Sequence, residues 1–200
     1  MKKTNKIGLF GGAFNPIHNG HLFVAKESIK TFNLNKIIFI PTGNPVFEKQ
    51  ELLNKQIRAN FVKNAISNEK NFEVSFFEIE REAPSFFIDT LQHFNNGKDM
   101  LFTILGEDTF MQFHKWKSPE EILENSYLIV AKRYEGNFVR TKKYIKKYFT
   151  EYKEKILFLS HPLFSISSTL IRERIKKEKH ISYLLPESIE KKIVENGYYR

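Results

Sequence analysis

The sequence contains no cysteine. This absence excludes a disulfide framework, a thiolate metal site and a cysteine nucleophile. Long hydrophobic runs are also missing, because the run at 37–40 is far shorter than the ~20 apolar residues that cross a membrane. The apolar stretch at 7–10, which follows a basic start, is too short for the core of a signal peptide. We therefore expect a cytoplasmic protein that makes no use of a membrane.

Negative charge is scarce relative to positive charge, since 32 Lys and Arg stand against 23 Asp and Glu, for a net charge of +9. This balance suits nucleic acid, anionic membranes or phosphorylated small molecules, and it also suits a lysine-rich surface. The densest basic stretch, 132–155, is mixed with Tyr, Phe and Glu, which favours a solvated helical face. The 200 residues, 41% of them hydrophobic, predict one globular domain over 1–200.

Short apolar runs alternate with amphipathic segments along the chain. Strands are predicted at 7–10, 36–40, 72–77, 100–105, 127–131 and 156–159, and helices at 22–32, 57–66, 86–94, 119–123, 139–149, 168–176 and 186–195. Ser118 is expected to cap the helix at 119–123. Strands separated by helices predict an α/β fold of Rossmann-like type, a doubly wound and mostly parallel sheet with helices on both faces. Ligands of such sheets bind beyond the carboxyl ends of the strands.

The first candidate site follows the first strand directly. Residues 11–21 read Gly-Gly-Ala-Phe-Asn-Pro-Ile-His-Asn-Gly-His. His18 and His21 are three apart at the predicted start of a helix and can share one face, while Gly20 leaves room between them. Two imidazoles and the free N–H groups of a helix start suit a polyphosphate. A metal site is not predicted, because the nearest acid, Glu27, lies six residues on, and the Gly-x-Gly-x-x-Gly dinucleotide motif is missing.

The second candidate site opens a helix near the end of the chain. Residues 166–174 read Ile-Ser-Ser-Thr-Leu-Ile-Arg-Glu-Arg, in which Ser167, Ser168 and Thr169 can cap the helix. Arg172 follows one turn later and can reach a phosphate held at the helix start. Taken alone, this segment is an ordinary capped helix with an exposed arginine. Together with the first site, this segment predicts a second set of contacts to the same polyphosphate.

These two segments resemble the nucleotidylyltransferase superfamily. The longer pattern at 11–21 resembles bacterial nicotinate mononucleotide adenylyltransferases, with Asn15 where those chains usually carry Asp. The segment 166–172 resembles the Ile-Ser-Ser-Thr-x-Ile-Arg element that holds ATP phosphates in that superfamily. The resemblance implies that His18, His21 and Arg172 are catalytic. It also implies an ATP site formed by Gly11, Gly12, Phe14, Gly20, Gly106, Asp108, Ser167, Ser168 and Thr169, because 106–108 resembles the Gly-x-Asp loop that contacts adenosine.

The acceptor side resembles the same family less closely. The resemblance implies acceptor contacts from Ala13, Lys49, Phe87, Trp116 and Arg133. The usual Pro-Pro-His-Lys becomes Pro45-Val46-Phe47-Glu48-Lys49, so whether Lys49 replaces the family lysine is open. The usual Tyr-Thr pair becomes Phe86-Phe87, which removes a hydroxyl donor from the expected pyridine pocket.

The resemblance implies adenylyl transfer from ATP to nicotinate mononucleotide, with Mg²⁺ delivered by ATP. The products would be nicotinate adenine dinucleotide and pyrophosphate, in NAD biosynthesis. An adenylyltransferase that takes nicotinamide mononucleotide or phosphopantetheine is the alternative, and a basic nucleic-acid-binding protein is the alternative outside this class. ATP and a pyridine mononucleotide are the expected partners, with no nucleic acid or membrane, in a monomer or a small homo-oligomer.

Overall fold

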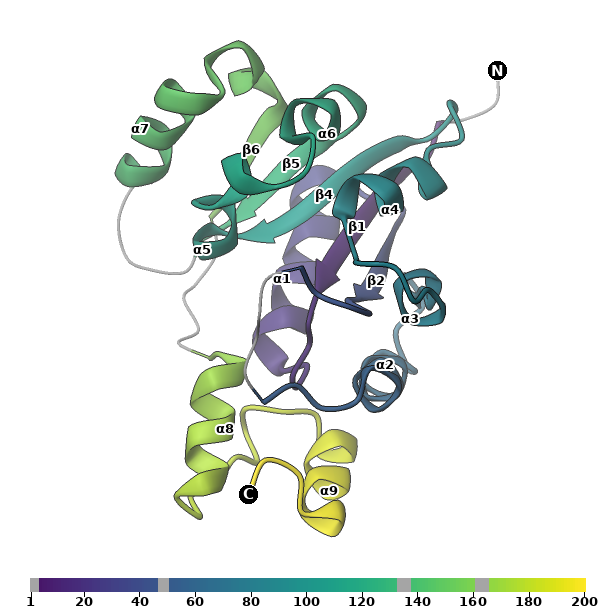
Figure 1. Cartoon of the computed structure of the whole chain (residues 1–200), viewed down its shortest axis with the longest axis vertical. Helices are drawn as coiled ribbons and strands as arrows, with labels where there is room; N and C mark the ends of the chain where they lie inside the picture. Colours follow the sequence, from purple (N-terminus) through teal and green to yellow (C-terminus); the bar gives the residue numbers. More distant parts are fainter. Residues whose placement is uncertain (1–3, 47–50, 133–137, 161–165) are drawn as a thin grey trace.

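The computed structural model describes residues 4–46, 51–132, 138–160 and 166–200. Its centre is a six-stranded sheet in the order β3-β2-β1-β4-β5-β6, in which each neighbouring pair is parallel (Figure 1). The strands are β1 (Lys6–Gly12), β2 (Lys36–Pro41), β3 (Phe72–Val74), β4 (Met100–Gly106), β5 (Tyr127–Ala131) and β6 (Ile156–Leu159). This order, with helices between successive strands, is the Rossmann-like arrangement that the sequence predicts.

Helices connect the strands and cover both faces of the sheet. The longer ones are α1 (Asn19–Phe32), α2 (Lys55–Ala65), α4 (Phe87–Phe94), α6 (Pro119–Asn125), α7 (Val139–Tyr148), α8 (Ser168–Lys176) and α9 (Glu187–Asn196). The short ones are α3 (Phe77–Glu80), α5 (Glu107–Phe110), η1 (Phe113–Lys115) and η2 (Thr150–Lys155). In the described residues, no helix is both long and apolar enough to cross a membrane.

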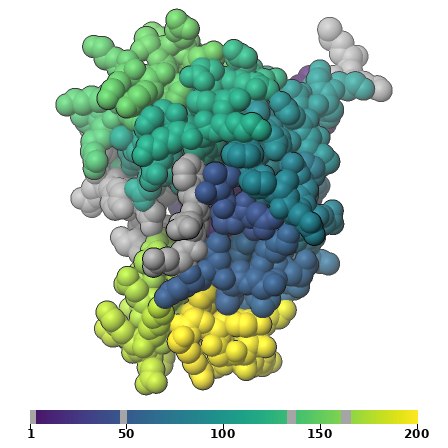
Figure 2. All heavy atoms as spheres, in the orientation of Figure 1, coloured from purple at the N-terminus to yellow at the C-terminus, as the bar shows by residue number. Residues whose placement is uncertain are grey.

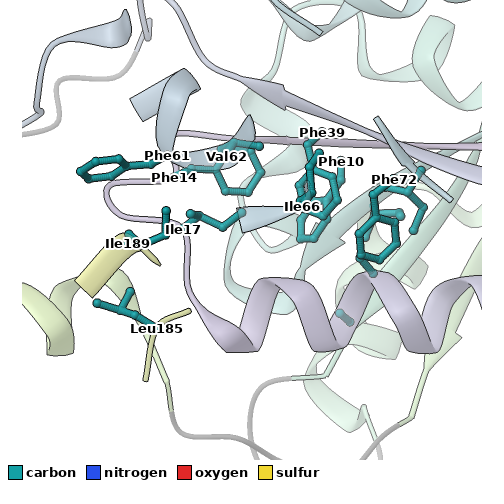
Figure 3. Packing of buried hydrophobic residues seen from close by; sticks show 14 of the residues in the cluster. Phe10, Phe14, Ile17, Phe39, Phe61, Val62, Ile66, Phe72, Leu185 and Ile189 are labelled. Carbon is teal, nitrogen blue, oxygen red and sulfur yellow. The ribbon is translucent and has the colours of Figure 1, made fainter. Parts of the chain in front are cut away.

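Two hydrophobic clusters lie on opposite faces of the sheet because successive strand residues point to opposite sides. In β2, Ile37 and Phe39 join the cluster that includes residues of α1, α2 and α9, whereas Ile38 and Ile40 join the cluster under α4, α6 and α7. Figure 3 shows the first cluster, with Phe10 and Phe39 side by side in the packed interior. Strands buried on both faces are nearly continuous apolar runs, which is why the sequence shows them clearly.

Two local predictions are wrong. The predicted strand 72–77 ends at Val74, because the Ser75 hydroxyl accepts a hydrogen bond from the Phe77 N–H at 3.2 Å and the chain turns into α3. Ser118 occupies the residue before α6, but it adopts a left-handed conformation (φ 51°) and its side chain makes no capping hydrogen bond. The short elements α3, α5, η1 and η2 were not predicted, because each has too few residues for a periodic pattern.

Within the basic stretch at 132–155, α7 is an amphipathic helix with a solvated face, as predicted. In α7, Tyr144 and Ile145 are buried, while the lysines at 142, 143, 146 and 147 are exposed. These charges therefore lie on a solvated face, and the helix is held to the sheet by its apolar side.

The last two helices lie together at the end of the molecule opposite α7 (Figure 1). Helix α9 packs against α2, and Figure 2 shows the corresponding atoms in contact along this edge. The beginning of α8 contacts the segment that follows β1, more than 140 residues earlier in the chain. There the Ser168 hydroxyl donates a hydrogen bond to the Pro16 carbonyl at 2.9 Å.

Candidate functional site

Two cavities open at the carboxyl ends of the central strands and share Gly106. The smaller one, of about 260 Å³, is lined by residues that follow β1, β4 and β5 and by the start of α8. The larger one, of about 390 Å³, is lined by the end of β1, the loop after β2, α4 and the segment after β4. This is the sheet edge at which parallel α/β sheets hold ligands.

The two histidines of the smaller cavity form a reciprocal pair at the start of α1. The His21 N–H donates to His18 Nδ1 at 3.3 Å, and the His18 N–H donates to His21 Nδ1 at 3.2 Å. The rings stack with centroids 3.6 Å apart. Because each Nδ1 accepts a hydrogen bond, a neutral ring carries its proton on Nε2. The two rings therefore lie on one face, as the spacing in the sequence predicts.

Gly20 lies tightly against the His18 ring. A Cβ at residue 20 would lie 3.0 Å from His18 Nδ1 and 3.1 Å from its Cε1. A side chain there would crowd the imidazole, which would have to move by a few tenths of an ångström to make room. Gly106 has a different role, since a Cβ there would meet nothing within 4 Å. The glycine therefore keeps open the space where the two cavities meet.

The start of α8 completes the smaller cavity. Ser167 caps the helix by accepting the Leu170 N–H at 3.0 Å, and Ser167, Ser168 and Thr169 all line the cavity. Arg172 lies one turn further on, where Nη1 donates to the Asn15 carbonyl at 2.9 Å and Nη2 to Thr169 Oγ1 at 3.4 Å. Its Nε is buried and donates to no atom among the described residues.

Aromatic rings and lysines line the larger cavity. The Phe87 and Trp116 rings lie 5.6 Å apart, and Lys117 Nζ sits 4.6 Å above the Phe86 ring. Lys115 also lines this space. Flat apolar surfaces beside positive charge suit an aromatic ring that carries an anionic group.

One buried carboxyl group also lines the larger cavity. Glu78 is only 4% exposed. Burial raises its pKa above the ordinary 4.5, while hydrogen bonds from Thr90, Ser85 and the Gly43 N–H act in the opposite direction. Burial is the larger effect, so Glu78 holds its proton more tightly than an exposed glutamate does.

Some residues of the predicted site lie elsewhere. The Phe14 side chain is 2% exposed in the core, with its ring edge-on to His21 at 5.0 Å, so it supports the histidine. The Ala13 carbonyl accepts from Arg58 at 2.6 Å, and Asp108 is half-buried at the start of α5. None of these three predicted residues lines either cavity. Lys49 and Arg133 lie outside the described residues.

Sequence reasoning missed two buried charged residues that support the site. Arg58 is 1% exposed and donates to backbone carbonyls of Ala13, Thr42 and Leu53, so it joins the loop after β1 to the loop after β2. A signal was present, because Arg58 lies three and four residues before the core residues Phe61 and Val62 on the same helical face. Glu78 lies directly after the strand predicted at 72–77, in the short helix α3, which was not predicted.

Comparisons with known proteins agree with this geometry. The cytidylyltransferase-like family model matches residues 9–174. A probable nicotinate-nucleotide adenylyltransferase of Clostridium tetani is 41% identical over 199 residues, covering 98% of this chain and 99% of that protein. The chain belongs to this adenylyltransferase family. A second member, a probable nicotinate-nucleotide adenylyltransferase of Dictyoglomus thermophilum, is 38% identical over 97% of this chain and 99% of its own length.

A solved structure shares the fold of this chain. The Plasmodium falciparum nicotinic acid mononucleotide adenylyltransferase complexed with NaAD superposes with a TM-score of 0.76 at 20% identity, covering 98% of this chain and 97% of that chain. At this identity the likeness concerns the fold. The family membership confirms the resemblance that the motifs at 11–21 and 166–172 indicated.

Proposed function

We propose that this member of the family transfers the adenylyl group of ATP to nicotinate mononucleotide, releasing pyrophosphate. The observation that carries the proposal is the convergence of His18 and His21 with the start of α8 on one cavity. A polar cavity of two imidazoles, a capped helix start and a nearby arginine suits a triphosphate. The adjoining aromatic cavity suits the pyridine ring of the acceptor.

The donor side would hold ATP along the smaller cavity. His18 and His21 donate through Nε2 to the α- and β-phosphates. Ser168, Thr169 and Arg172 hold the β- and γ-phosphates, and the buried Nε of Arg172 is a donor with no hydrogen-bond partner in the part of the chain that the structure describes. Gly11, Gly12, Gly20 and Gly106 leave space for the nucleotide, and Asp108 binds the adenosine ribose. His18, His21, Gly20, Gly106, Ser168 and Thr169 line the smaller cavity, whereas Gly11 and Gly12 line the larger one. Asp108 and Arg172 line neither cavity, so their assignments rest on the family motifs.

The acceptor side would hold the mononucleotide in the larger cavity. The pyridine ring lies against Phe87 and Trp116, and Gly106 marks the point where the two substrates meet. Lys115 and Lys117 supply positive charge for an anionic acceptor. Lys49 and Arg133 are further acceptor contacts proposed from the family motifs.

The reaction needs no general base, since the acceptor phosphate is already an anionic nucleophile. One of its oxygens attacks the α-phosphorus of ATP and forms a new P–O bond. The bond from that phosphorus to the α,β-bridging oxygen breaks, and the oxygen leaves with the electron pair as part of pyrophosphate. Catalysis then depends on positioning and on donors aimed at the charge that develops on the leaving group.

Mg²⁺ would accompany ATP. Among the described residues, no group of three or more His, Asp and Glu side chains is placed to hold a metal ion. Phosphate oxygens and water molecules are therefore the expected ligands of this ion, which is a common arrangement for Mg²⁺ with nucleotides.

A coupled pyrophosphate-release assay tests the proposal. The purified protein is given ATP and Mg²⁺ with nicotinate mononucleotide, nicotinamide mononucleotide or phosphopantetheine. We expect the highest kcat/KM with nicotinate mononucleotide. A higher value with nicotinamide mononucleotide would reassign the acceptor, and this second candidate is tested because Phe87 replaces the hydroxyl that the family usually offers there. No release with any acceptor would remove the enzyme assignment.

A further inference from the structure

The segment after α9 reaches back into the phosphate-binding region. Helix α9 ends at Gly197, whose left-handed conformation (φ 63°) turns the chain so that Tyr199 enters the core. The Tyr199 hydroxyl donates to Asn15 Oδ1 at 2.8 Å, a buried hydrogen bond between residues 184 positions apart. Tyr199 thus contacts the same 11–21 segment that carries both histidines.

Asn15 is held at both ends of its side chain. Its Nδ2 donates to the Glu51 carbonyl at 2.9 Å, and its Oδ1 accepts from the Leu53 N–H at 3.2 Å as well as from Tyr199. The residue is 3% exposed. Buried hydrogen bonds of this kind fix one orientation, since an unmade bond there is costly.

The backbone of Asn15 in turn orients Arg172. Its carbonyl accepts from Arg172 Nη1 at 2.9 Å, and the guanidinium is planar, so this contact and the Thr169 contact set the direction of the remaining Nε–H. Burial raises the pKa of Tyr199 despite the nearby Arg172 and Arg58, so the hydroxyl remains protonated and able to donate near neutral pH.

We infer that Asn15 and Tyr199 are positioning residues for Arg172: the Tyr199 hydroxyl fixes Asn15, whose carbonyl aims the guanidinium at the ATP phosphates. This inference rests on the proposed function, because it takes Arg172 as a phosphate ligand. It assigns a role in substrate binding to a tyrosine that, like Arg172 itself, does not line either cavity and that acts through its hydrogen bond to Asn15.

Tyr199→Phe tests this inference by removing one hydroxyl oxygen. We expect KM for ATP to rise about three- to ten-fold, the range that corresponds to one hydrogen bond. The KM for the acceptor and kcat should stay within about two-fold of the wild-type values, because the substitution weakens only the binding of the ATP phosphates. Tyr198→Phe is the matched control, since it removes the same atom from the neighbouring ring, which packs on Phe61, and it should leave all three values unchanged.

A double-mutant cycle with Arg172→Ala separates positioning from a general structural effect. If Tyr199 acts through Arg172, then Tyr199→Phe adds nothing to the KM for ATP once Arg172 is alanine. An unchanged KM for ATP in Tyr199→Phe, or the same factor in both backgrounds, would overturn the inference. If the wild-type protein releases no pyrophosphate with any acceptor, the proposed reaction fails, and the same cycle is then measured as the Kd of ATP by calorimetry. Loss of coupling in that measurement would overturn the inference by itself.

Discussion

His18 and His21 each use Nδ1 to accept a hydrogen bond from the backbone N–H of the other residue. This reciprocity explains why both must be histidine: the Nδ1 acceptor satisfies an N–H at the start of α1, and Nε2 supplies the donor. The sequence predicted both residues and their shared face. It did not predict the stacking of the rings, which depends on the extended backbone of His18 (φ −148°).

We expect His18→Ala to lower kcat by about 10²–10³, the usual cost of losing one preorganised donor to a charged transition state. The KM for ATP should change less, because the α8 contacts remain. Pyrophosphate release under saturating substrates measures this effect. His180→Ala, an exposed histidine outside both cavities at this sheet edge, is the control and should retain full turnover. Wild-type turnover in His18→Ala would refute the catalytic assignment.

Glu78 predicts a pH-dependent stability. The folded protein binds the proton of the Glu78 carboxyl group more tightly than the unfolded chain does. The stabilisation that this proton gives to the folded state is therefore fully present below the ordinary pKa of 4.5, and it is lost as the pH rises through the raised pKa. Glu78→Gln removes the ionisation. We therefore expect the free energy of unfolding of Glu78→Gln to improve relative to wild type as the pH rises from about 4 to about 8.

Urea unfolding at several pH values measures this difference. Glu80→Gln, an exposed change on the same short helix, serves as the control, and its difference from wild type should be nearly independent of pH. A free energy of unfolding of Glu78→Gln that stays constant or falls relative to wild type as the pH rises would contradict the raised pKa.

At the scale of the element, the start of α1 is shaped for the site more than for helix stability. Glycine is a poor helix former, and replacing it with alanine inside a helix is worth up to ~1 kcal/mol. Gly20 lies in the first turn of α1 and is retained next to the His18 ring. Gly20 therefore lowers the helix propensity of this turn, and it leaves the space that the histidine pair occupies.

Gly20→Ala separates these two demands. We expect an unchanged or slightly higher Tm, together with a kcat about ten-fold lower, because a displaced catalytic group loses its alignment with the substrate. Thermal unfolding and pyrophosphate release on the same preparation give both values. Lys30→Ala, an exposed change in the last turn of α1, should leave kcat intact. Undiminished turnover in Gly20→Ala would show that the His18 ring tolerates the added methyl group.

Which elements the sequence predicts follows from how they are buried. Apart from β3, the strands are nearly continuous apolar runs, and the long helices have one apolar face, so their positions are predicted within a few residues. The exception is β3, where Ser75 ends the strand early. Arg58 and Tyr199 are different, because their partners are backbone groups or distant side chains. Only the folded chain brings such partners together.

At the scale of the whole molecule, the site joins segments from both ends of the described chain. The 11–21 segment follows β1, α8 arrives after β6, and Tyr199 follows α9. The sequence motifs predicted the two segments of the phosphate site, 11–21 and 166–172, but no local sequence pattern showed that these segments are in contact. The folded chain makes that contact after β6, where the Ser168 hydroxyl at the start of α8 donates to the Pro16 carbonyl.

That residues 1–200 form a single domain stays a prediction. One cooperative unit should unfold in a single transition whose calorimetric enthalpy equals the van't Hoff enthalpy. The buried hydrogen bonds from Tyr199 and Arg172 to Asn15 tie α8 and α9 to the sheet, which favours this result. Differential scanning calorimetry of the intact chain measures it, and two separate transitions would show that the region of α8 and α9 unfolds independently.

The central claim is tested most directly by a crystal structure of the protein with a non-hydrolysable ATP analogue and Mg²⁺. The account predicts that the triphosphate lies in the smaller cavity, with His18 and His21 on its α- and β-phosphates and with Thr169 and Arg172 on its β- and γ-phosphates. A triphosphate bound away from these side chains, or one that contacts the histidines but not α8, would contradict it.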